Sequence, residues 1–306
     1  MASTTSTPRV SKRRIRADGT NDNRVRGLRW WIELGWRHVL ALALIVICVL
    51  PLLYIVSASL NPSGHLTGSN QLFRRLSFQN YADLLPEGFG TWMVNSLVIS
   101  TSTAIGTVLM GAAAAYAFSR FRFRGRRASL TTLFILQMFP QMLAFVAIFL
   151  VLLSLGDVIP VLGLNSHLAL IAVYLGGALG INTFLMYGFF NTVPRELDEA
   201  AKIDGATHAQ IFWRIIVRLV TPILIVVGLL SFIGTYSDFI IARVVLQRPD
   251  QFTLAIGLYN WGSDERTAPW GLFAAGAVIA AIPVVALFLY LQRYVVSGLT
   301  AGSVKG

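Results

Sequence analysis

The sequence predicts an all-α protein that crosses a membrane several times. Hydrophobic residues make up 55% of its 306 residues and charged residues only 13%, whereas about 25% of the residues in a typical soluble domain are charged. The charges also leave long gaps, including 29 uncharged residues over 128–156 and 26 over 267–292. Each gap exceeds the roughly 20 apolar residues that span a bilayer as a helix, and neither shows the polar and apolar alternation of barrel strands.

Six apolar segments are expected to form transmembrane helices, because a helix satisfies its own backbone hydrogen bonds inside hydrocarbon. They cover about residues 38–60, 92–118, 129–154, 168–190, 219–241 and 271–292. Pro51, Pro140 and Pro283 fall inside three of these segments, and a fourth carries Gly176 and Gly180 at GxxxG spacing. Such positions favour kinks or close packing between helices.

The placement of lysine and arginine predicts that both termini are cytoplasmic. Of the 25 such residues, nine lie in 1–37, five in 119–128, four in 191–218 and two in 293–306, which leaves five for the outer loops. Positively charged loops stay on the cytoplasmic side of a membrane. The net charge of +11 would suggest a nucleic-acid partner in a soluble protein, but here topology explains it, and no nucleic-acid partner is expected.

The charge and composition pattern divides the chain into three parts. Residues 1–37 are rich in Ser, Thr and Arg with few apolar residues, so we expect a disordered basic leader in the cytoplasm. Residues 38–292 are expected to form the six-helix membrane domain, and 293–306 a cytoplasmic tail. The alternative for the first apolar run is a cleaved signal peptide, but its core of about 19 residues exceeds the usual 7 to 15.

Few residues could carry catalytic or metal chemistry. The single cysteine, Cys48, excludes a disulfide framework, and the four histidines are isolated from one another, so no metal site is expected. A Walker A loop requires a Gly-Lys pair, but the three lysines follow Ser11, Ala201 and Val304. We therefore expect no catalytic residue and no bound cofactor on this chain.

The predicted cytoplasmic loop 191–218 contains a pattern typical of a short helix of about ten residues. Asn191 or Thr192 suits its N-cap, Pro194 its first turn, and Gly205 the left-handed position after its last turn. One face has i, i+3, i+4 spacing, with two adjacent alanines that would let another surface approach closely: Leu197, Ala200, Ala201 and Asp204. On this pattern alone, the simpler interpretation is a solvated amphipathic connector, followed by a second helix over 208–220.

Several separated segments resemble the permease subunits of ABC importers, in particular those of the maltose-transporter MalG type. In the loop, Glu199-Ala200-Ala201-x3-Gly205 is similar to the EAA motif of that family. Further similar segments occur in the same order along residues 38–306: Gln137-Met138-Phe139-Pro140, Ala172-x-Tyr174-Leu175-Gly176-Gly177, Thr253-Leu254-Ala255-x-Gly257 and Gly298-Leu299-Thr300-Ala301-Gly302-x-Val304-Lys305-Gly306.

The chain departs from the family pattern directly after the loop. The family motif closes with Ile-x-Leu-Pro, whereas this chain has Ile215-Ile216-Val217-Arg218, and its next proline is Pro222. The position at which the second helix breaks is therefore left open by the sequence.

The resemblance implies a type I ABC importer permease with the MetI-like fold, in the cell membrane of a bacterium. The loop would then be a coupling helix that docks in a cleft of an ATPase subunit through Glu199, Ala200, Ala201, Asp204 and Gly205. ATP and Mg would be bound by that ATPase and not by this chain. The tail, with Gly302 and Lys305, would reach between two ATPase subunits, although a flexible terminus is simpler on its residues alone.

The resemblance also implies a set of partners and a cargo. The partners are a MalF-like second permease subunit, two copies of a MalK-like ATPase, an extracytoplasmic sugar-binding protein and membrane lipid. The outer loop over 247–270 would contact the binding protein through Leu254, Gly257 and Tyr259, or its aromatic residues simply lie at the membrane interface. The cargo would be maltose, a maltodextrin or a related α-glucoside, with another oligosaccharide or a glycerol-phosphate-type ligand as the alternative.

Two polar residues inside predicted spans are candidates for the substrate pathway, Gln137 and Asp238. An acid within a membrane is a functional candidate, although an ion pair between Asp238 and Arg243 is the simpler interpretation. An ion-coupled secondary transporter is the rival function from another class. It would need ion sites near the membrane midplane and often internal repeats, and the sequence shows neither clearly.

Overall fold

The computed structural model describes residues 31, 35–62, 72–73, 76–138, 141–263 and 269–301. Every regular element in these ranges is a helix, which confirms the predicted all-α class. The chain divides into two compact units, residues 1–54 and 55–306. Most of the expected leader lies outside the described residues, as do Pro140 and the tail residues Gly302 and Lys305.

The first unit contributes most of α2 (Trp36–Ser59), an apolar helix with Pro51 in its interior. The remaining described helices follow in the order α3 (Gln79–Asp83), α4 (Phe89–Arg120), α5 (Arg126–Gln137), η2 (Gln141–Ala144), α6 (Phe145–Val158), η3 (Pro160–Leu162), α7 (His167–Phe190), α8 (Glu196–Ile203), α9 (His208–Gln210), η4 (Ile211–Ile216), α10 (Val217–Leu219), α11 (Thr221–Ser237), α12 (Ile240–Val245), η5 (Pro249–Gln251), α13 (Leu254–Gly262) and α14 (Trp270–Ala301).

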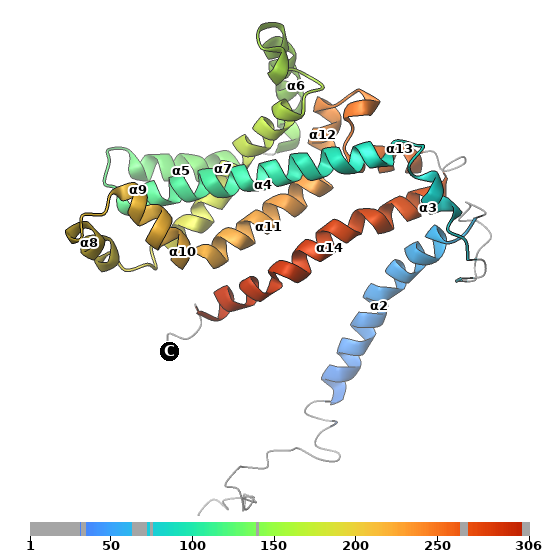
Figure 1. Cartoon of the computed structure of the whole chain (residues 1–306), viewed down its shortest axis with the longest axis horizontal. Helices are drawn as coiled ribbons and strands as arrows, with labels where there is room; N and C mark the ends of the chain where they lie inside the picture. Colours follow the sequence, from blue (N-terminus) through green and yellow to red (C-terminus); the bar gives the residue numbers. More distant parts are fainter. Residues whose placement is uncertain are drawn as a thin grey trace, which may run out of the picture. The chain divides into compact units, whose positions relative to one another are not determined.

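The second unit is built around α4, which packs against α7 on one side and α11 on another, with α14 beside α11 (Figure 1). Glycines let α4 and α7 approach closely. A Cβ atom on Gly106 would lie 2.7 Å from Leu175 Cδ2, and one on Gly111 would lie 3.1 Å from Met186 Sδ. Short helices gather at the two ends of this bundle, with α8, α9 and α10 at one end and α12 and α13 at the other (Figure 1).

Two buried clusters form the core, one toward each end of the bundle. The cluster near α12 and α13 includes Trp92 and Leu254, and the cluster near α8 and η4 includes Met186 and Ile216. Each group of short helices therefore packs on its own buried cluster.

Among the described residues, four helices are long and apolar enough to cross a membrane: α2, α4, α7 and α14. A fifth span results if the bent pair of 208–219 and 221–237 is counted as one. These helices coincide with five of the six predicted segments. The total of six spans and the cytoplasmic location of both termini stay predictions.

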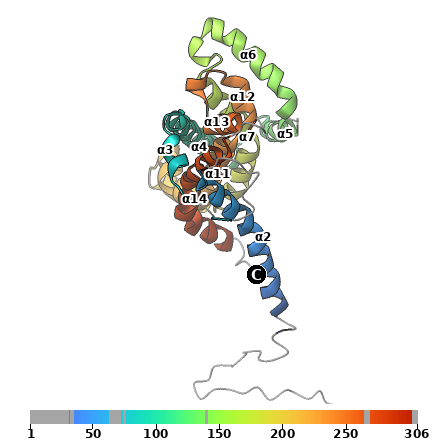
Figure 2. The same cartoon turned by 90° about the vertical axis from the view of Figure 1, so that its right-hand side faces the viewer.

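The expectation of one continuous helix over 129–154 is wrong. The segment is divided between α5, which ends at Gln137, and α6, which begins at Phe145 after the short η2. α5 packs against α7, whereas α6 projects away from the bundle on the side of α12 (Figures 1 and 2). The sequence between them contains Pro140, and proline removes a backbone donor and disfavours a helical conformation in the preceding residue.

Candidate functional sites

We call residues 191–218 the inner loop and residues 247–270 the outer loop, after the predicted orientation. The inner loop contains the predicted short helix as α8, with three acids in its first turn, where they interact favourably with the helix dipole. The predicted N-caps are wrong, and Pro194 lies before the helix rather than in its first turn, because α8 begins after Arg195. Asn191 instead ends α7, and the Thr192 hydroxyl donates to the Phe189 carbonyl oxygen at 2.8 Å.

Gly205 ends α8 in the left-handed conformation that the sequence predicts, with a φ of +80°. Its amide donates to the Lys202 carbonyl oxygen at 3.0 Å, and the amide of Ala206 donates to the Ala201 carbonyl oxygen at 2.9 Å. These two bonds make a Schellman motif. A Cβ atom at residue 205 would meet nothing within 4 Å, so the cost of a side chain there comes from the backbone conformation alone.

A buried ion pair attaches α8 to the end of α4. Arg120 Nε lies 2.6 Å from Asp198 Oδ2, and the two side chains are 5% and 11% exposed. Arg120 also donates to the Val193 carbonyl oxygen at 3.0 Å, and Arg195 donates to the Ser119 carbonyl oxygen at 2.9 Å. Hydrogen bonds from charged donors are roughly twice as strong as neutral ones, so α8 and the end of α4 are held as one piece.

The face of α8 that the sequence predicts to be a single surface is divided in the structure. Ala201 is 7% exposed and belongs to the buried cluster near α8 and η4, whereas Ala200 is exposed. The reason is that the Asp198 ion pair turns its side of the helix, which includes Ala201, toward the bundle. The exposed residues on the opposite side have i, i+3, i+4, i+7 spacing, and we call them the open face of α8: Glu196, Glu199, Ala200 and Ile203.

The second helix of the inner loop begins with a reciprocal cap and ends in a sharp bend. The side chains of Thr207 and Gln210 each bond the other residue's backbone amide, which is a capping box. The chain then passes through the π-helical η4 and α10 and bends by 79° before α11. Pro222 lies in the first turn of α11, so the break falls just before it and Arg218 remains helical.

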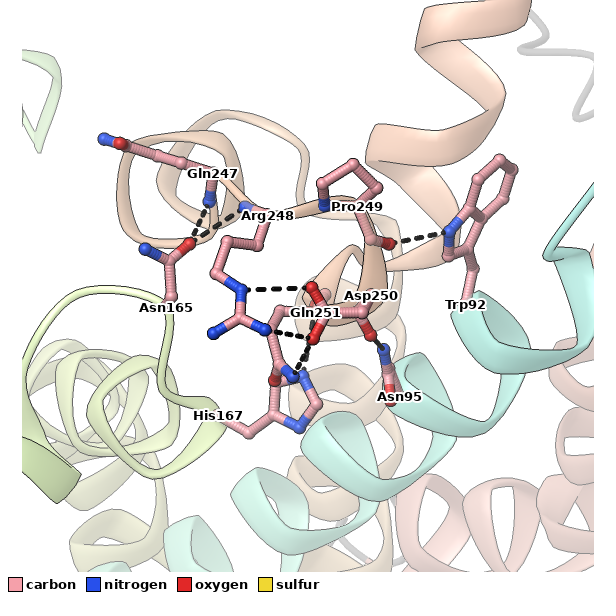
Figure 3. A network of polar contacts seen from close by, with 9 residues as sticks. All are labelled: Trp92, Asn95, Asn165, His167, Gln247, Arg248, Pro249, Asp250 and Gln251. Carbon is pink, nitrogen blue, oxygen red and sulfur yellow. Dashed lines mark hydrogen bonds and ion pairs between the residues drawn. The ribbon is translucent and has the colours of Figure 1, made fainter.

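The outer loop is fixed to α4 through its backbone (Figure 3). Trp92 Nε1 donates to the Pro249 carbonyl oxygen at 3.2 Å. Asn95 Nδ2 donates to the Phe252 carbonyl oxygen at 3.0 Å. Each bond uses a backbone acceptor in or beside η5. The path of the chain there is therefore fixed by α4 independently of the side chains of the outer loop.

A second set of contacts joins the outer loop to the start of α7 (Figure 3). Asn165 has a φ of +60°, and its side-chain oxygen accepts from the backbone amides of Gln247 at 2.6 Å and Arg248 at 2.9 Å. His167 Nε2 lies 3.1 Å from the Gln251 carbonyl oxygen. The outer loop is thus tied at two separate places. Asparagine tolerates the left-handed region, but no motif in the sequence singles out Asn165.

The ion pair of the outer loop is exposed, unlike that of the inner loop. Arg248 lies 2.9 Å from an Asp250 oxygen, and their side chains are 66% and 51% exposed. The side-chain amide of Gln251 and the guanidinium of Arg248 lower the pKa of Asp250 below its ordinary value. Exposed pairs of this kind contribute little to stability.

Two of the three predicted contact residues of the outer loop are buried in the structure. Leu254 is 2% exposed, and its amide donates to the Ser96 hydroxyl at 2.7 Å. Gly257 is buried, and a Cβ atom on it would overlap the ring of Trp92. Neither residue presents a surface to an external protein, because α13 packs both of them onto α4. Tyr259 is 54% exposed, with its ring 4.3 Å from that of Phe239, and it alone of the three remains available.

Asp238 lies at the break between α11 and α12 and does not pair with Arg243. Its Oδ1 accepts from the Tyr174 hydroxyl at 2.7 Å and from the Ala242 amide at 3.0 Å. Arg243 instead lies over the ring of Phe252 at 5.4 Å. The break also ends the predicted fifth span at residue 237, four residues earlier than expected.

The other predicted pathway residue, Gln137, is bound to a neighbouring helix. Its Nε2 donates to the Gly177 carbonyl oxygen at 2.8 Å, and Gly180 lies so close that a Cβ atom there would overlap the Gln137 side chain. Gln137 and Asp238 thus both hold elements to α7. In the described ranges, no group of three or more His, Cys, Asp or Glu side chains is placed to hold a metal ion.

Comparison with known sequences places most of the chain in one family. The family described as binding-protein-dependent transport system inner membrane component matches residues 107–300. The galactooligosaccharides transport system permease protein GanQ of Bacillus subtilis (strain 168) is 40% identical over 283 residues, which cover 91% of this chain and 98% of GanQ. The maltose/maltodextrin transport system permease protein MalG of Photorhabdus laumondii subsp. laumondii is 37% identical, covering 89% of this chain and 97% of that protein.

The fold is also similar to that of solved structures. A chain of a bacterial ABC transporter involved in the import of the acidic polysaccharide alginate superimposes with a TM-score of 0.74 at 22% identity. The match covers 88% of this chain and 99% of that one. At this identity the likeness concerns the fold alone.

Proposed function

We propose a specific transport role for this chain, which belongs to the family of binding-protein-dependent transport system inner membrane components. It is a multi-pass membrane subunit, the permease of a sugar ABC importer, and not an enzyme. We propose that it works with a second permease subunit, two copies of an ATPase that binds ATP and Mg, and an extracytoplasmic sugar-binding protein.

The observation that carries the proposal is the construction of α8. One side of this helix is locked to the end of α4 by the buried pair of Arg120 and Asp198. The open face carries two acids, a small residue and Ile203, which is 87% exposed although it is apolar. The small Ala200 beside Ile203 would let the surface of another protein approach this face closely. We propose that this surface docks on the ATPase.

The attachment of α8 suggests how ATPase closure would reach the membrane. Asp198 of α8 pairs with Arg120, which also donates to the Val193 carbonyl oxygen just after α7, and Arg195 at the start of α8 donates to the Ser119 carbonyl oxygen. A displacement of α8 would therefore displace the inner ends of α4 and α7. These two helices pack along one another and continue to the outer end of the bundle. A rigid-body rotation of this kind is a common way for a local movement to open one side of a protein and close the other.

At the opposite end, we propose that the outer loop receives the sugar-binding protein. The backbone of residues 247–252 is held by α4 and by Asn165 and His167. Tyr259 projects from α13 with half of its surface exposed. A rigid support with an exposed tyrosine suits protein contact, because tyrosine offers a large contact area and loses little conformational entropy.

We propose maltodextrins or related α-glucosides as the cargo. Support comes from the likeness to MalG, whereas GanQ, at similar identity, supports galactooligosaccharides as the second candidate. Both candidates are uncharged oligosaccharides.

The proposal is tested with the complex assembled from this chain, the second permease and the ATPase, reconstituted into vesicles with the binding protein. We expect ATP hydrolysis to rise when the binding protein is loaded with maltotriose and sugar to accumulate inside. A matched assay with a galactotriose-loaded binding protein distinguishes the two cargo candidates. ATP turnover by the isolated chain, or uptake without the ATPase, would contradict the assigned role.

A further inference from the structure

A basic cavity of about 740 Å³ lies at the turn between α4 and α5. Leu130 and Tyr187 line it together with four arginines that lie within six consecutive residues: Arg122, Arg124, Arg126 and Arg127. The last two belong to the first turn of α5, where the positive end of the helix dipole adds to their charge. This cavity has no part in the transport mechanism described above.

The charges of this cavity are not balanced by the chain itself. In the described part of the chain the ion pairs are Arg120 with Asp198 and Arg248 with Asp250, and no acid lines the cavity. Arg126 alone has a fixed polar partner there, since it donates to the Tyr187 hydroxyl at 2.9 Å and lies over the same ring. Four cations gathered in one concave surface without an acid indicate an anionic ligand from outside the chain.

The surroundings of the cavity indicate which kind of anion it binds. Phe121 and Phe123 alternate with the arginines and are 39% and 45% exposed. On α5, Leu130 reaches the cavity, and Phe134, one turn further along the same face, is 53% exposed. The basic surface is therefore continuous with an apolar one, as required by a molecule with an anionic head and a hydrocarbon tail.

We propose that this cavity binds the phosphate headgroup of an anionic lipid from the cytoplasmic leaflet, with an acyl chain lying along α5. Arginine suits this role because its planar fork donates two parallel hydrogen bonds to phosphate oxygens. Basic pockets beside membrane helices on the cytoplasmic side are a general way of holding such headgroups. A free phosphate would use the arginines but not the exposed phenylalanines beside them.

The test uses the full chain, purified in detergent with the subunits that accompany it, and phosphatidylglycerol as the probe. Retained lipid is measured by native mass spectrometry after exchange into mixtures with phosphatidylcholine. We expect preferential retention of phosphatidylglycerol and a loss of affinity of about tenfold or more in the double variant Arg124→Gln/Arg127→Gln. Both side chains are exposed and unpaired in the described structure, so the variant should fold.

A control and a conservative variant complete the experiment. Arg214→Gln/Arg218→Gln removes the same charge from exposed positions on the inner side and should retain the lipid, and Arg124→Lys/Arg127→Lys should retain it better than the glutamine variant. Equal lipid retention by the cavity variant and the control would overturn the proposal. Displacement of the lipid by inorganic phosphate would assign the cavity to a free anion, and loss of the ATPase from the cavity variant would assign it to a protein contact.

Discussion

The inner and outer loops both join membrane helices, but they are attached to the bundle in opposite ways. α8 of the inner loop is held on one side by a buried ion pair and leaves its other side open. The outer loop is held mainly through backbone carbonyl and amide groups, from α4 and from the start of α7, and its ion pair is exposed. The first arrangement suits the transmission of a displacement from the proposed ATPase, whereas the second suits a surface that stays in place.

The largest effect should come from breaking the attachment of α8. Asp198→Asn leaves Arg120 buried without its counter-charge, and removing one member of a buried pair costs about 3–5 kcal/mol. We expect a marked fall in the thermal stability of the complex and loss of sugar uptake, measured on the same preparation.

The matched control is Asp250→Asn, which breaks the exposed pair of the outer loop. It should leave uptake unchanged and alter stability only slightly, because exposed ion pairs contribute little. Equal losses of stability and uptake in Asp198→Asn and Asp250→Asn would show that burial of the ion pair does not determine its contribution.

Gly257→Ala tests the packing of the outer loop. A Cβ atom there would overlap the ring of Trp92, and overpacking of this kind costs about 1–3 kcal/mol. We expect a lowered melting temperature and weaker uptake, because α13 must move away from α4. A larger residue at this position would therefore unfold the outer end before it could test binding-protein contact. Wild-type stability of Gly257→Ala would refute the close contact.

Gly205→Ala tests the inner loop through backbone conformation rather than through packing. The space around residue 205 is open, so the expected cost is the roughly 1–2 kcal/mol of a left-handed conformation for a residue with a Cβ atom. Asn is better tolerated there, so Gly205→Asn should lie between wild type and Gly205→Ala. Gly205→Val should separate ATP hydrolysis from uptake or release the ATPase while leaving membrane insertion intact. Unaltered uptake in the valine variant would make α8 a passive connector.

Tyr259→Ala should affect function without affecting stability. The ring packs at a tilt against that of Phe239, and the side chain is half exposed, so little core is lost. If the outer loop holds the binding protein, stimulation of ATP hydrolysis by the sugar-loaded binding protein should fall by about fivefold or more, while basal hydrolysis persists. A stimulation curve that superimposes on the wild-type curve would remove Tyr259 from the contact.

The smallest expected effect is on the pH dependence of stability. Because the pKa of Asp250 is lowered in the folded chain, its contribution is fully present above the unfolded value of about 3.9 and is lost as pH falls through the lower folded value. The difference in melting temperature between wild type and Asp250→Asn should thus stay constant from about pH 8 to pH 5. A difference that changes within this range would contradict the assigned shift.

The sequence predicts features that depend on local pattern and misses those that depend on distant partners. The left-handed conformation of Gly205 is predicted correctly, because a glycine directly after an amphipathic helix commonly ends that helix in this conformation. The pairing of Arg120 with Asp198 joins residues from two separate elements, and no spacing rule connects them. The same holds for Gly257, whose role depends on Trp92, and for Ala201, whose burial follows from the ion pair beside it.

We propose that α8 has one side attached to the bundle and one side open to the ATPase, and cysteine cross-linking tests this arrangement directly. In a chain with Cys48→Ser, the variant Ile203→Cys places a thiol on the open face, and Ala201→Cys places one on the buried side as a control. We expect cross-linking of Ile203→Cys to the ATPase subunit, in a yield that changes with nucleotide, and none from Ala201→Cys. Cross-linking from the buried position, or from neither, would contradict it.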